Sequence, residues 1–235
     1  MTDLSQLKFF ATPPHACSYL EDERATTLFV DPAARIDPPL YSALSQLGFR
    51  RSGRHLYRPH CQACNACIPV RVRIEDFTPS RSQRRVERRN AGLTVTSAPP
   101  RLSDESYALY ARYIEARHAD GDMYPPSPDQ FASFLFSDWS DTRFLSFRDD
   151  GRLVAVAVVD LVADGLSAIY TFYDPDEDAR SLGRYAILWQ LADARRRGLP
   201  HLYLGYWIKQ CRKMNYKTDF RPLEMFLGER WVQVD

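Results

Sequence analysis

The sequence lacks a long hydrophobic run. Its most apolar stretches, such as residues 153–159, are far shorter than the roughly 20 residues that a membrane-spanning helix requires. The N-terminal residues also lack the basic segment and following apolar segment of a secretory signal. Internal repeats and low-complexity tracts are absent, so the 235 residues are expected to form one large or two small globular domains. These absences predict a cytoplasmic protein with no membrane partner.

A disulfide framework is missing as well. The chain has five cysteines, an odd number, and three of them fall within residues 61–67. This pattern is typical of metal-binding or buried thiols in a reducing compartment. The CxxCxxC spacing favours zinc or an iron–sulfur cluster with a distant fourth thiolate, and free buried or redox-sensitive thiols explain it equally well. The candidate ligands are Cys17, Cys61, Cys64 and Cys67.

The net charge is only +1, but the charges are strongly segregated. Residues 50–90 contain eleven arginines and no lysine against three acidic residues, a net charge of +8. Five of these arginines recur at three- and four-residue spacing, which places most of them on one side of a helix. Guanidinium groups bind phosphate through several donors, so this side is predicted to contact RNA; a solvated helix with excess charge is the alternative. The five are Arg81, Arg84, Arg85, Arg88 and Arg89.

Helical and extended patterns alternate in the second half of the chain. Two helical segments are followed by three β-rich runs joined at Asp150-Gly151 and Asp164-Gly165, and then by a helix over about residues 181–197. Two strands with a short helix at 208–216 between them complete the order. This order predicts an α+β fold in which a mixed sheet, flanked by helices, changes from antiparallel to parallel across the long helix. It suits the acyl-CoA N-acyltransferase (GNAT) superfold.

The proline-containing run at residues 94–100 predicts a domain boundary near residue 99. On this hypothesis, residues 1–99 form a smaller Cys- and Arg-rich N-terminal domain. Residues 100–235 form the GNAT-like domain.

Several motifs in the second half resemble the arginyl/leucyl-tRNA–protein transferases. They are Tyr170-Thr-Phe-Tyr-Asp-Pro175, Ser181-Leu-Gly183, the run from Leu199 to Ile208, and Lys213-Met-Asn-Tyr-Lys217. The first half adds Cys17-Ser-Tyr-Leu20, Tyr57-Arg-Pro59, the CxxCxxC run and Ser80-Arg-Ser-Gln-Arg-Arg85. Together these motifs cover nearly the whole chain, which makes chance agreement implausible.

Within that family the chain looks like the bacterial aspartate/glutamate leucyltransferase branch, because Leu20 and the CxxCxxC run replace cysteines typical of the arginyl branch. The resemblance implies an aminoacyltransferase whose partners are leucyl-tRNA and proteins with an N-terminal Asp or Glu. Leucine would pass to the acceptor's α-amine, which marks the protein for degradation by the N-end rule. No cofactor is required for that chemistry. Arginyl-tRNA as the donor stays open.

Asp174 and Tyr170, from the first motif, are the candidate catalytic residues. Asp174 is expected to orient or deprotonate the acceptor's α-ammonium, whereas a plain Asp-Pro turn is the alternative. Four aromatic residues are suited to wall a leucine pocket or to stack on the terminal adenine of the tRNA: Tyr170, Tyr173, Tyr206 and Trp207. Packing in the hydrophobic core explains these aromatic residues equally well.

The lysines near the C-terminus predict a cationic stripe. Lys209, Lys213 and Lys217 are spaced by four residues on the expected short helix, with Tyr216 adjacent. A cation is needed near the acidic side chain of the acceptor and near the phosphates of the tRNA end. Lys213, Tyr216 and Lys217 are therefore candidate substrate-binding residues, and a solvated helix face is the alternative.

Gly183 stands alone at the start of the long helix, where CoA-binding members of the superfold usually have a Gly-x-Gly type loop for the pyrophosphate. The single glycine disfavours CoA and leaves space for the acceptor end of a tRNA, so Gly183 is a candidate substrate-binding residue. A CoA-dependent N-acyltransferase stays open as another enzyme. A non-catalytic, metal-stabilised RNA-binding module stays open as a different class of protein.

Overall fold

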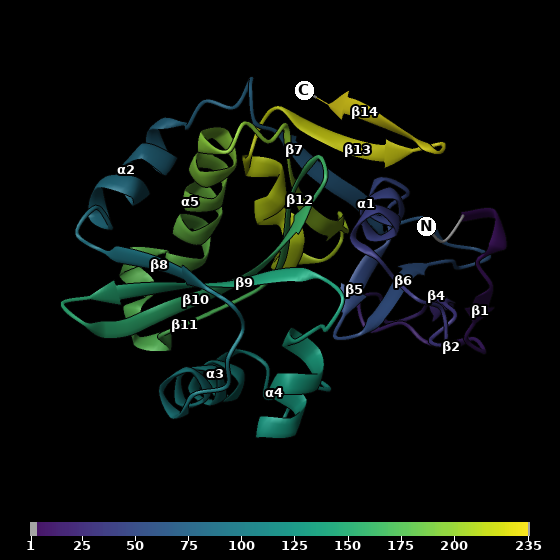
Figure 1. Cartoon of the computed structure of the whole chain (residues 1–235), viewed down its shortest axis with the longest axis horizontal. Helices are drawn as coiled ribbons and strands as arrows, with labels where there is room; N and C mark the ends of the chain where they lie inside the picture. The colour runs from purple at the N-terminus through teal and green to yellow at the C-terminus, as the bar shows by residue number, and fades with distance from the viewer. Residues whose placement is uncertain (1–3, 235) are drawn as a thin grey trace.

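The computed structural model describes residues 4–234 and contains a large mixed sheet of eight strands (Figure 1). In chain order these strands are β7 (Ile68–Arg73), β8 (Thr94–Ala98), β9 (Asp141–Asp149), β10 (Arg152–Val162), β11 (Gly165–Tyr173), β12 (His201–Trp207), β13 (Leu223–Leu227) and β14 (Arg230–Val234). Their order in the sheet is β14-β13-β7-β12-β11-β10-β9-β8. All neighbours are antiparallel except β11 and β12, which run parallel and are joined through helix α5 (Leu182–Arg196). The predicted α+β plan with a mixed sheet is confirmed.

Two tight turns produce the meander from β9 to β11. Asp150 and Gly151 form the first turn, and both have positive φ (46° and 88°), as a type I′ hairpin requires. The second turn lies one residue before the predicted Asp164-Gly165 pair, because Gly165 is already the first residue of β11. A Cβ atom on Gly165 would lie 2.4 Å from the carbonyl oxygen of His201. This glycine therefore permits the close approach of β12 rather than the turn.

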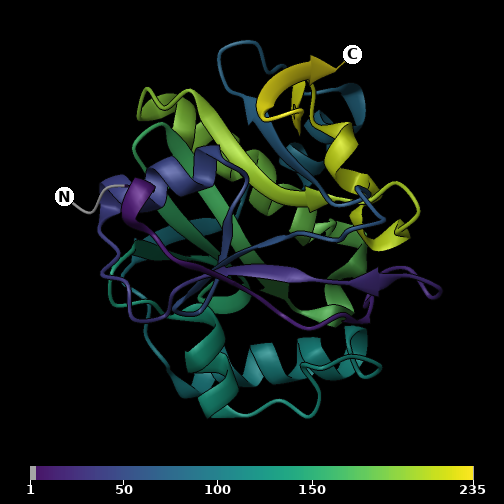
Figure 2. The ribbon, with the colours of Figure 1, turned by 90° about the vertical axis from the view of Figure 1, so that its right-hand side faces the viewer.

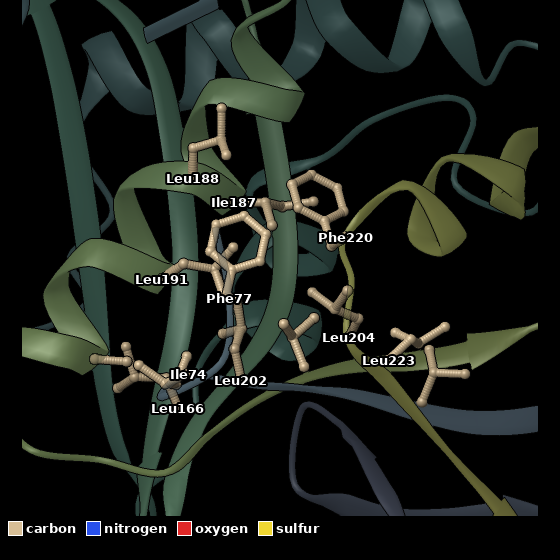
Figure 3. Packing of buried hydrophobic residues seen from close by; sticks show 13 residues of the cluster. Ile74, Phe77, Leu166, Ile187, Leu188, Leu191, Leu202, Leu204, Phe220 and Leu223 are labelled. Atoms are coloured by element: carbon tan, nitrogen blue, oxygen red, sulfur yellow. The ribbon is translucent and has the colours of Figure 1, made fainter. Parts of the chain in front are cut away.

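Helices cover both faces of the large sheet. On one face lie α5 and α2 (Arg81–Arg89), and on the other lie α3 (Asp104–Arg117) and α4 (Pro128–Leu135) (Figure 1). The core under α5 joins side chains from distant segments, including Phe77, Leu191, Leu202 and Phe220 (Figure 3). Helix α5 ends close to where the sequence predicts, at Arg196, and Gly198 follows with φ of +68°. Among residues 4–234, no helix is long and apolar enough to cross a bilayer.

A smaller sheet and helix α1 (Pro38–Gln46) are built from the first sixty residues (Figure 2). This sheet has the order β1-β4-β6-β5, formed by β1 (Phe9–Ala11), β4 (Thr27–Val30), β6 (His55–Pro59) and β5 (Arg50–Ser52). The Asp37 side chain caps α1 by accepting from the Leu40 N–H at 2.9 Å, as the Asp-Pro pair suggests. The remaining elements are the pair β2 (His15–Ala16) and β3 (Arg24–Ala25) and the 3₁₀ helices η1 (Leu4–Gln6), η2 (Pro175–Arg180) and η3 (Arg212–Asp219).

The segment before residue 99 contributes to the large sheet as well as to the small one. β7 lies in the middle of the large sheet and β8 at its edge, although both precede residue 99. The two sheets are also joined by a buried ion pair between Arg51 of β5 and Asp160 of β10. The large sheet therefore contains strands from both sides of residue 99, and the boundary between residues 1–99 and 100–235 stays a prediction.

Candidate active site

The parallel strands β11 and β12 separate after a short paired stretch. Residues 165–167 pair with residues 201–203, whereas β11 continues to Tyr173 and β12 to Trp207. On their outer edges the two strands remain paired with β10 and β7. The sheet thus opens into a fork, formed by residues 168–173 on one arm and 204–207 on the other. Among residues 4–234, no strand pairs with the inner edges of the fork. Backbone groups there must find partners other than a neighbouring strand, and the carbonyls of Ala168 and Tyr206 accept from the side chains of Arg50 and Lys217.

Arg50, the first residue of β5, closes the base of the fork. Its guanidinium donates to the Ser167 hydroxyl (Nη1–Oγ 2.8 Å) and to the backbone carbonyl of Ala168. On the other arm, Gly205 has φ of +78°, and a Cβ atom there would lie 3.3 Å from Nε of Arg50. Glycine provides both the left-handed backbone and the space beside the guanidinium. A cation is thereby fixed where the two strands part.

Helix η3 brings Tyr216 and Lys217 to the fork. Lys217 is 8% exposed and donates from Nζ to the backbone carbonyl of Tyr206 on β12. Tyr216 is 36% exposed. Burial raises the pKa of Tyr216, the nearby Arg50 opposes the rise, and Tyr173 at the end of the other arm adds to it. η3 therefore lies against β12 with one side chain close to each arm.

The predicted lysine stripe is not formed. Residues 212–219 form a 3₁₀ helix, in which residues three apart, not four apart, share one side. Lys217 is buried, while Lys209 and Lys213 are exposed. Lys213 instead lies 3.6 Å from Asp120, in an ion pair between two exposed side chains. A spacing of four residues aligns side chains only in an α-helix, so the 3₁₀ geometry of η3 separates these lysines.

Tyr206 anchors its arm of the fork to the smaller sheet. It is 9% exposed, and its hydroxyl lies 2.9 Å from the carbonyl oxygen of Gly48 and 3.2 Å from that of Tyr57. Trp207 packs against the core under α5, and its Nε1 has no partner among the residues that the structure describes. A buried donor without an acceptor is costly. Trp207 therefore remains a candidate for substrate contact, whereas Tyr206 packs as a core residue.

Tyr170 lies in the aromatic cluster on the α3 and α4 side of the sheet. Its ring centroid lies 5.1 Å from that of Phe134 and 6.2 Å from that of Tyr113, and its hydroxyl donates to the Met123 sulfur at 3.8 Å. Burial raises the pKa of this phenol, and neighbouring tyrosines raise it further. The hydroxyl therefore stays protonated at neutral pH and cannot accept a proton from the substrate.

Asp174 follows β11 directly and is 3% exposed. Its two carboxylate oxygens accept from Arg112 (2.7 Å) and Arg152 (2.8 Å), and the Asp176 N–H donates to it at 3.1 Å. These contacts tie the end of β11 to α3 and β10. Because guanidinium donors hold both oxygens, the geometry favours an anchoring role for Asp174 over the predicted role of general base.

Asp174→Asn is expected to keep the aminoacyl transfer that the resemblance implies within about threefold of the wild-type rate at saturating acceptor. Loss of a general base would instead cost about 100-fold or more. The free energy of unfolding should fall by about 1–2 kcal/mol, between the values for exposed and buried ion pairs, because both arginines are half-exposed. Single-turnover transfer and urea unfolding measure the two effects. A 100-fold slower transfer by a folded variant would restore Asp174 to the catalytic centre.

The five arginines of α2 form an exposed cationic surface. Ser80 and Gln83 form a capping box that starts the helix, and the Val86 side chain packs against the core under α5. All five guanidinium groups are thereby turned outward. Within residues 4–234, no acidic side chain forms an ion pair with any of them. Exposed arginines without acidic partners remain available to phosphates.

Three contacts connect this arginine surface to the fork. The Gln83 amide donates to the Asp219 carbonyl at 2.9 Å, and the Asp219 carboxylate pairs with Arg184 of α5 at 2.5 Å. Gly183, in the first turn of α5, packs on Tyr173, and a Cβ atom there would lie 3.2 Å from the tyrosine ring. Gly183, Tyr216 and Lys217 are thus gathered at the fork, with α2 next to them.

The cysteines gather around Cys67, which directly precedes β7. Burial raises the pKa of the Cys67 thiol to about 12, and the nearby thiols of the other four cysteines contribute to the rise. Cys211, which the sequence analysis leaves out of the ligand set, belongs to this group. All five are free cysteines, neither fully buried nor fully exposed.

The positions of these thiols do not by themselves make a metal centre. In the described part of the chain, no group of three or more Cys, His, Asp or Glu side chains is arranged to hold a metal ion. The arrangement is compatible with the free-thiol alternative, and the zinc or iron–sulfur site at Cys17, Cys61, Cys64 and Cys67 stays a prediction. Metal analysis of anaerobically purified protein tests it.

Arg50 is the residue of the fork that sequence analysis misses. It is one of eleven arginines in its segment, and its charge alone does not distinguish it from the surface arginines of α2. The available signal is the Arg50-Arg51 pair in a strand, because adjacent strand residues point to opposite faces. Two cations on opposite faces of one strand predict that at least one points inward.

Two family models match this chain. The model described as arginine-tRNA-protein transferase, N terminus, matches residues 15–85, and the C-terminus model matches residues 105–227. An aspartate/glutamate leucyltransferase of Pseudomonas fluorescens (strain SBW25) is 60% identical over 235 residues, which is 100% of both chains. Proteins of the same name from Pseudomonas aeruginosa (strain LESB58) and Stutzerimonas stutzeri (strain A1501) are each 62% identical over 232 residues, 99% of each chain.

These matches extend over nearly the full chain, so the resemblance that the motifs indicate is confirmed. The chain is a transferase and belongs to the arginine-tRNA-protein transferase family.

Proposed function

We propose that this chain transfers leucine from leucyl-tRNA to the α-amine of proteins that begin with Asp or Glu. The observation that carries this proposal is the full-length similarity to proteins named aspartate/glutamate leucyltransferase. The product is an acceptor protein with a new N-terminal leucine, which is an N-degron.

The chemistry needs little from the protein beyond positioning and charge stabilisation. The donor is an ester, and the acceptor amine has an ordinary pKa of about 7.7–8.0, so part of it is neutral at pH 7. Attack on the ester gives a tetrahedral oxyanion, and fixed donors or cations near it lower the barrier. The fork supplies the Arg50 guanidinium, which is fixed there by its bond to the Ala168 carbonyl of β11. We assign the ester carbonyl of the donor to the fork, beside the Arg50 guanidinium. In this assignment β11, α5 and β12 form a GNAT-like arrangement.

The arginine surface of α2 is suited to the tRNA. Phosphate contacts supply most of the affinity of such complexes, and they require exposed cations without acidic partners. The contacts through Asp219 hold α2 beside the fork. The acceptor end of a tRNA bound on α2 therefore lies close to the fork. The acceptor's N-terminal Asp or Glu carries a negative charge, so its binding at the fork, near Tyr216, requires a cation. Lys213 is the nearest exposed lysine in sequence, and its exposed pair with Asp120 exchanges at little cost.

The test combines purified protein with one donor at a time and with peptides that begin with Asp, Glu, Lys or Ala. The donors are leucyl-tRNA, arginyl-tRNA and acetyl-CoA, and mass spectrometry identifies the product. The proposal expects the mass of one leucine on the Asp and Glu peptides only. Transfer of arginine or acetyl, or leucine on the Lys and Ala peptides to the same extent, would contradict it.

A further inference from the structure

Lys217 is a buried amine without an acidic partner. It is 8% exposed, and among residues 4–234 no carboxylate forms an ion pair with its Nζ. Its hydrogen bond goes to the backbone carbonyl of Tyr206, and the Tyr216 ring centroid lies 6.0 Å from Nζ. A buried ammonium is normally compensated by a carboxylate, so this lysine calls for an explanation.

Burial and a neighbouring cation disfavour the protonated form of Lys217. The Arg50 guanidinium acts on it from β5, and the Cys211 thiol acts from the start of its own helix. Burial and then the charge of Arg50 lower the pKa of Lys217 to about 7, and the nearby Cys211 acts in the opposite direction. The lysine is therefore partly a free amine at neutral pH, with a lone pair beside the fork.

The other candidates considered among residues 4–234, which are Asp174, Tyr170 and Cys67, do not offer such a lone pair. The Asp174 oxygens are held by two arginines, and the Tyr170 phenol keeps its proton. Burial likewise keeps the Cys67 thiol protonated, with its pKa raised to about 12. Lys217 thus combines a side chain held against β12 by its bond to the Tyr206 carbonyl, burial and an accessible free-base form.

We propose that Lys217 is the general base of the transfer reaction, an assignment that rests on the proposed function. The acceptor's neutral amine attacks the ester carbonyl, and a C–N bond forms. Nζ of Lys217 takes the proton that the attacking nitrogen loses. As the tetrahedral intermediate collapses, the bond between the carbonyl carbon and the ribose oxygen breaks, and the Lys217 ammonium returns the proton to that oxygen.

The test uses Lys217→Met, Lys217→Arg and Lys217→Ala in the full chain, with Lys8→Met as the matched control because Lys8 is exposed. Single-turnover leucine transfer is expected to slow about 100-fold or more in the first two variants, since arginine keeps the charge and a donor but cannot act as a base. Lys8→Met should transfer at the wild-type rate. If Lys217 only bonded to the Tyr206 carbonyl, Lys217→Arg would retain most of the rate, and the assignment would be refuted.

Two further readouts separate catalysis from folding. In Lys217→Ala, added ethylamine should restore transfer in proportion to its free-base concentration. In the wild type, the plot of log kcat/KM against pH should approach a slope of 2 below pH 7, because both the acceptor amine and Lys217 must lose a proton. In Lys217→Met the slope should approach 1, because only the acceptor amine titrates. Absence of ethylamine rescue together with an unchanged pH slope would refute the base role. Failure of the wild type to transfer leucine would instead refute the proposed function.

Discussion

Replacing Arg51 with methionine is expected to lower the free energy of unfolding by about 3–5 kcal/mol, because the change leaves a charged carboxylate in the core. The side chains of Arg51 and Asp160 are 0% exposed, and Nε and Nη2 lie 2.5 Å and 2.8 Å from the two carboxylate oxygens. Tyr41 and Thr142 donate to the same carboxylate, each at 2.7 Å. These neutral donors do not replace the lost cation. The midpoint of urea unfolding measures the loss.

Arg54→Met is the matched control. Arg54 pairs with Asp138 at 3.3 Å, but the two side chains are 73% and 66% exposed, so this pair contributes about 0–1 kcal/mol. The double variant Arg51→Met/Asp160→Asn should recover part of the loss, because no charge is then left unpaired in the core. If Arg51→Met costs no more than Arg54→Met, the buried pair does not stabilise the junction between the two sheets.

Local sequence predicts the second half of the fold because its signals are short-range. The Asp150-Gly151 turn and the glycine after α5 each depend on the backbone conformation of a few residues. The place of β7 could not be predicted in the same way. Its neighbours are β12 and β13, more than a hundred residues later in the chain, and pairing at that distance leaves no local pattern.

The sequence predicts the candidate site in part, because it points to Gly183, Tyr216 and Lys217 but not to Arg50. Gly183, Tyr216 and Lys217 do meet at the fork. The sequence could not show that Lys217 is buried while Lys213 is exposed, because that difference depends on the 3₁₀ geometry of η3. Asp174 was assigned as a base because nothing near it in sequence reveals the guanidinium groups of Arg112 and Arg152. Long-range charge partners decide what an ionisable residue can do.

Reversing two charges on α2 is expected to weaken the binding of leucyl-tRNA by roughly 50- to 100-fold at 0.1 M salt. Arg84 and Arg85 are exposed and have no acidic partner among residues 4–234; Arg84 donates only to the Pro79 carbonyl. Each lost phosphate contact lowers the slope of log K against log salt by about 0.9 for duplexes, which corresponds to about a factor of eight in affinity at 0.1 M. Arg84→Glu/Arg85→Glu should therefore reduce the slope by about 2. Filter binding over a range of salt concentrations measures both quantities.

The control must carry the same change in net charge on another surface. Arg101 and Arg230 are exposed and lie outside α2 and the fork, so Arg101→Glu/Arg230→Glu serves this purpose. It should lower affinity far less, since distant exposed charges are largely screened beyond about 8–10 Å at these salt concentrations. Equal losses in the two double variants would mean that overall charge, not the α2 surface, attracts the tRNA. An unchanged affinity and salt slope in Arg84→Glu/Arg85→Glu would remove α2 from the RNA interface, while leaving the fork and its lysine to be tested on their own.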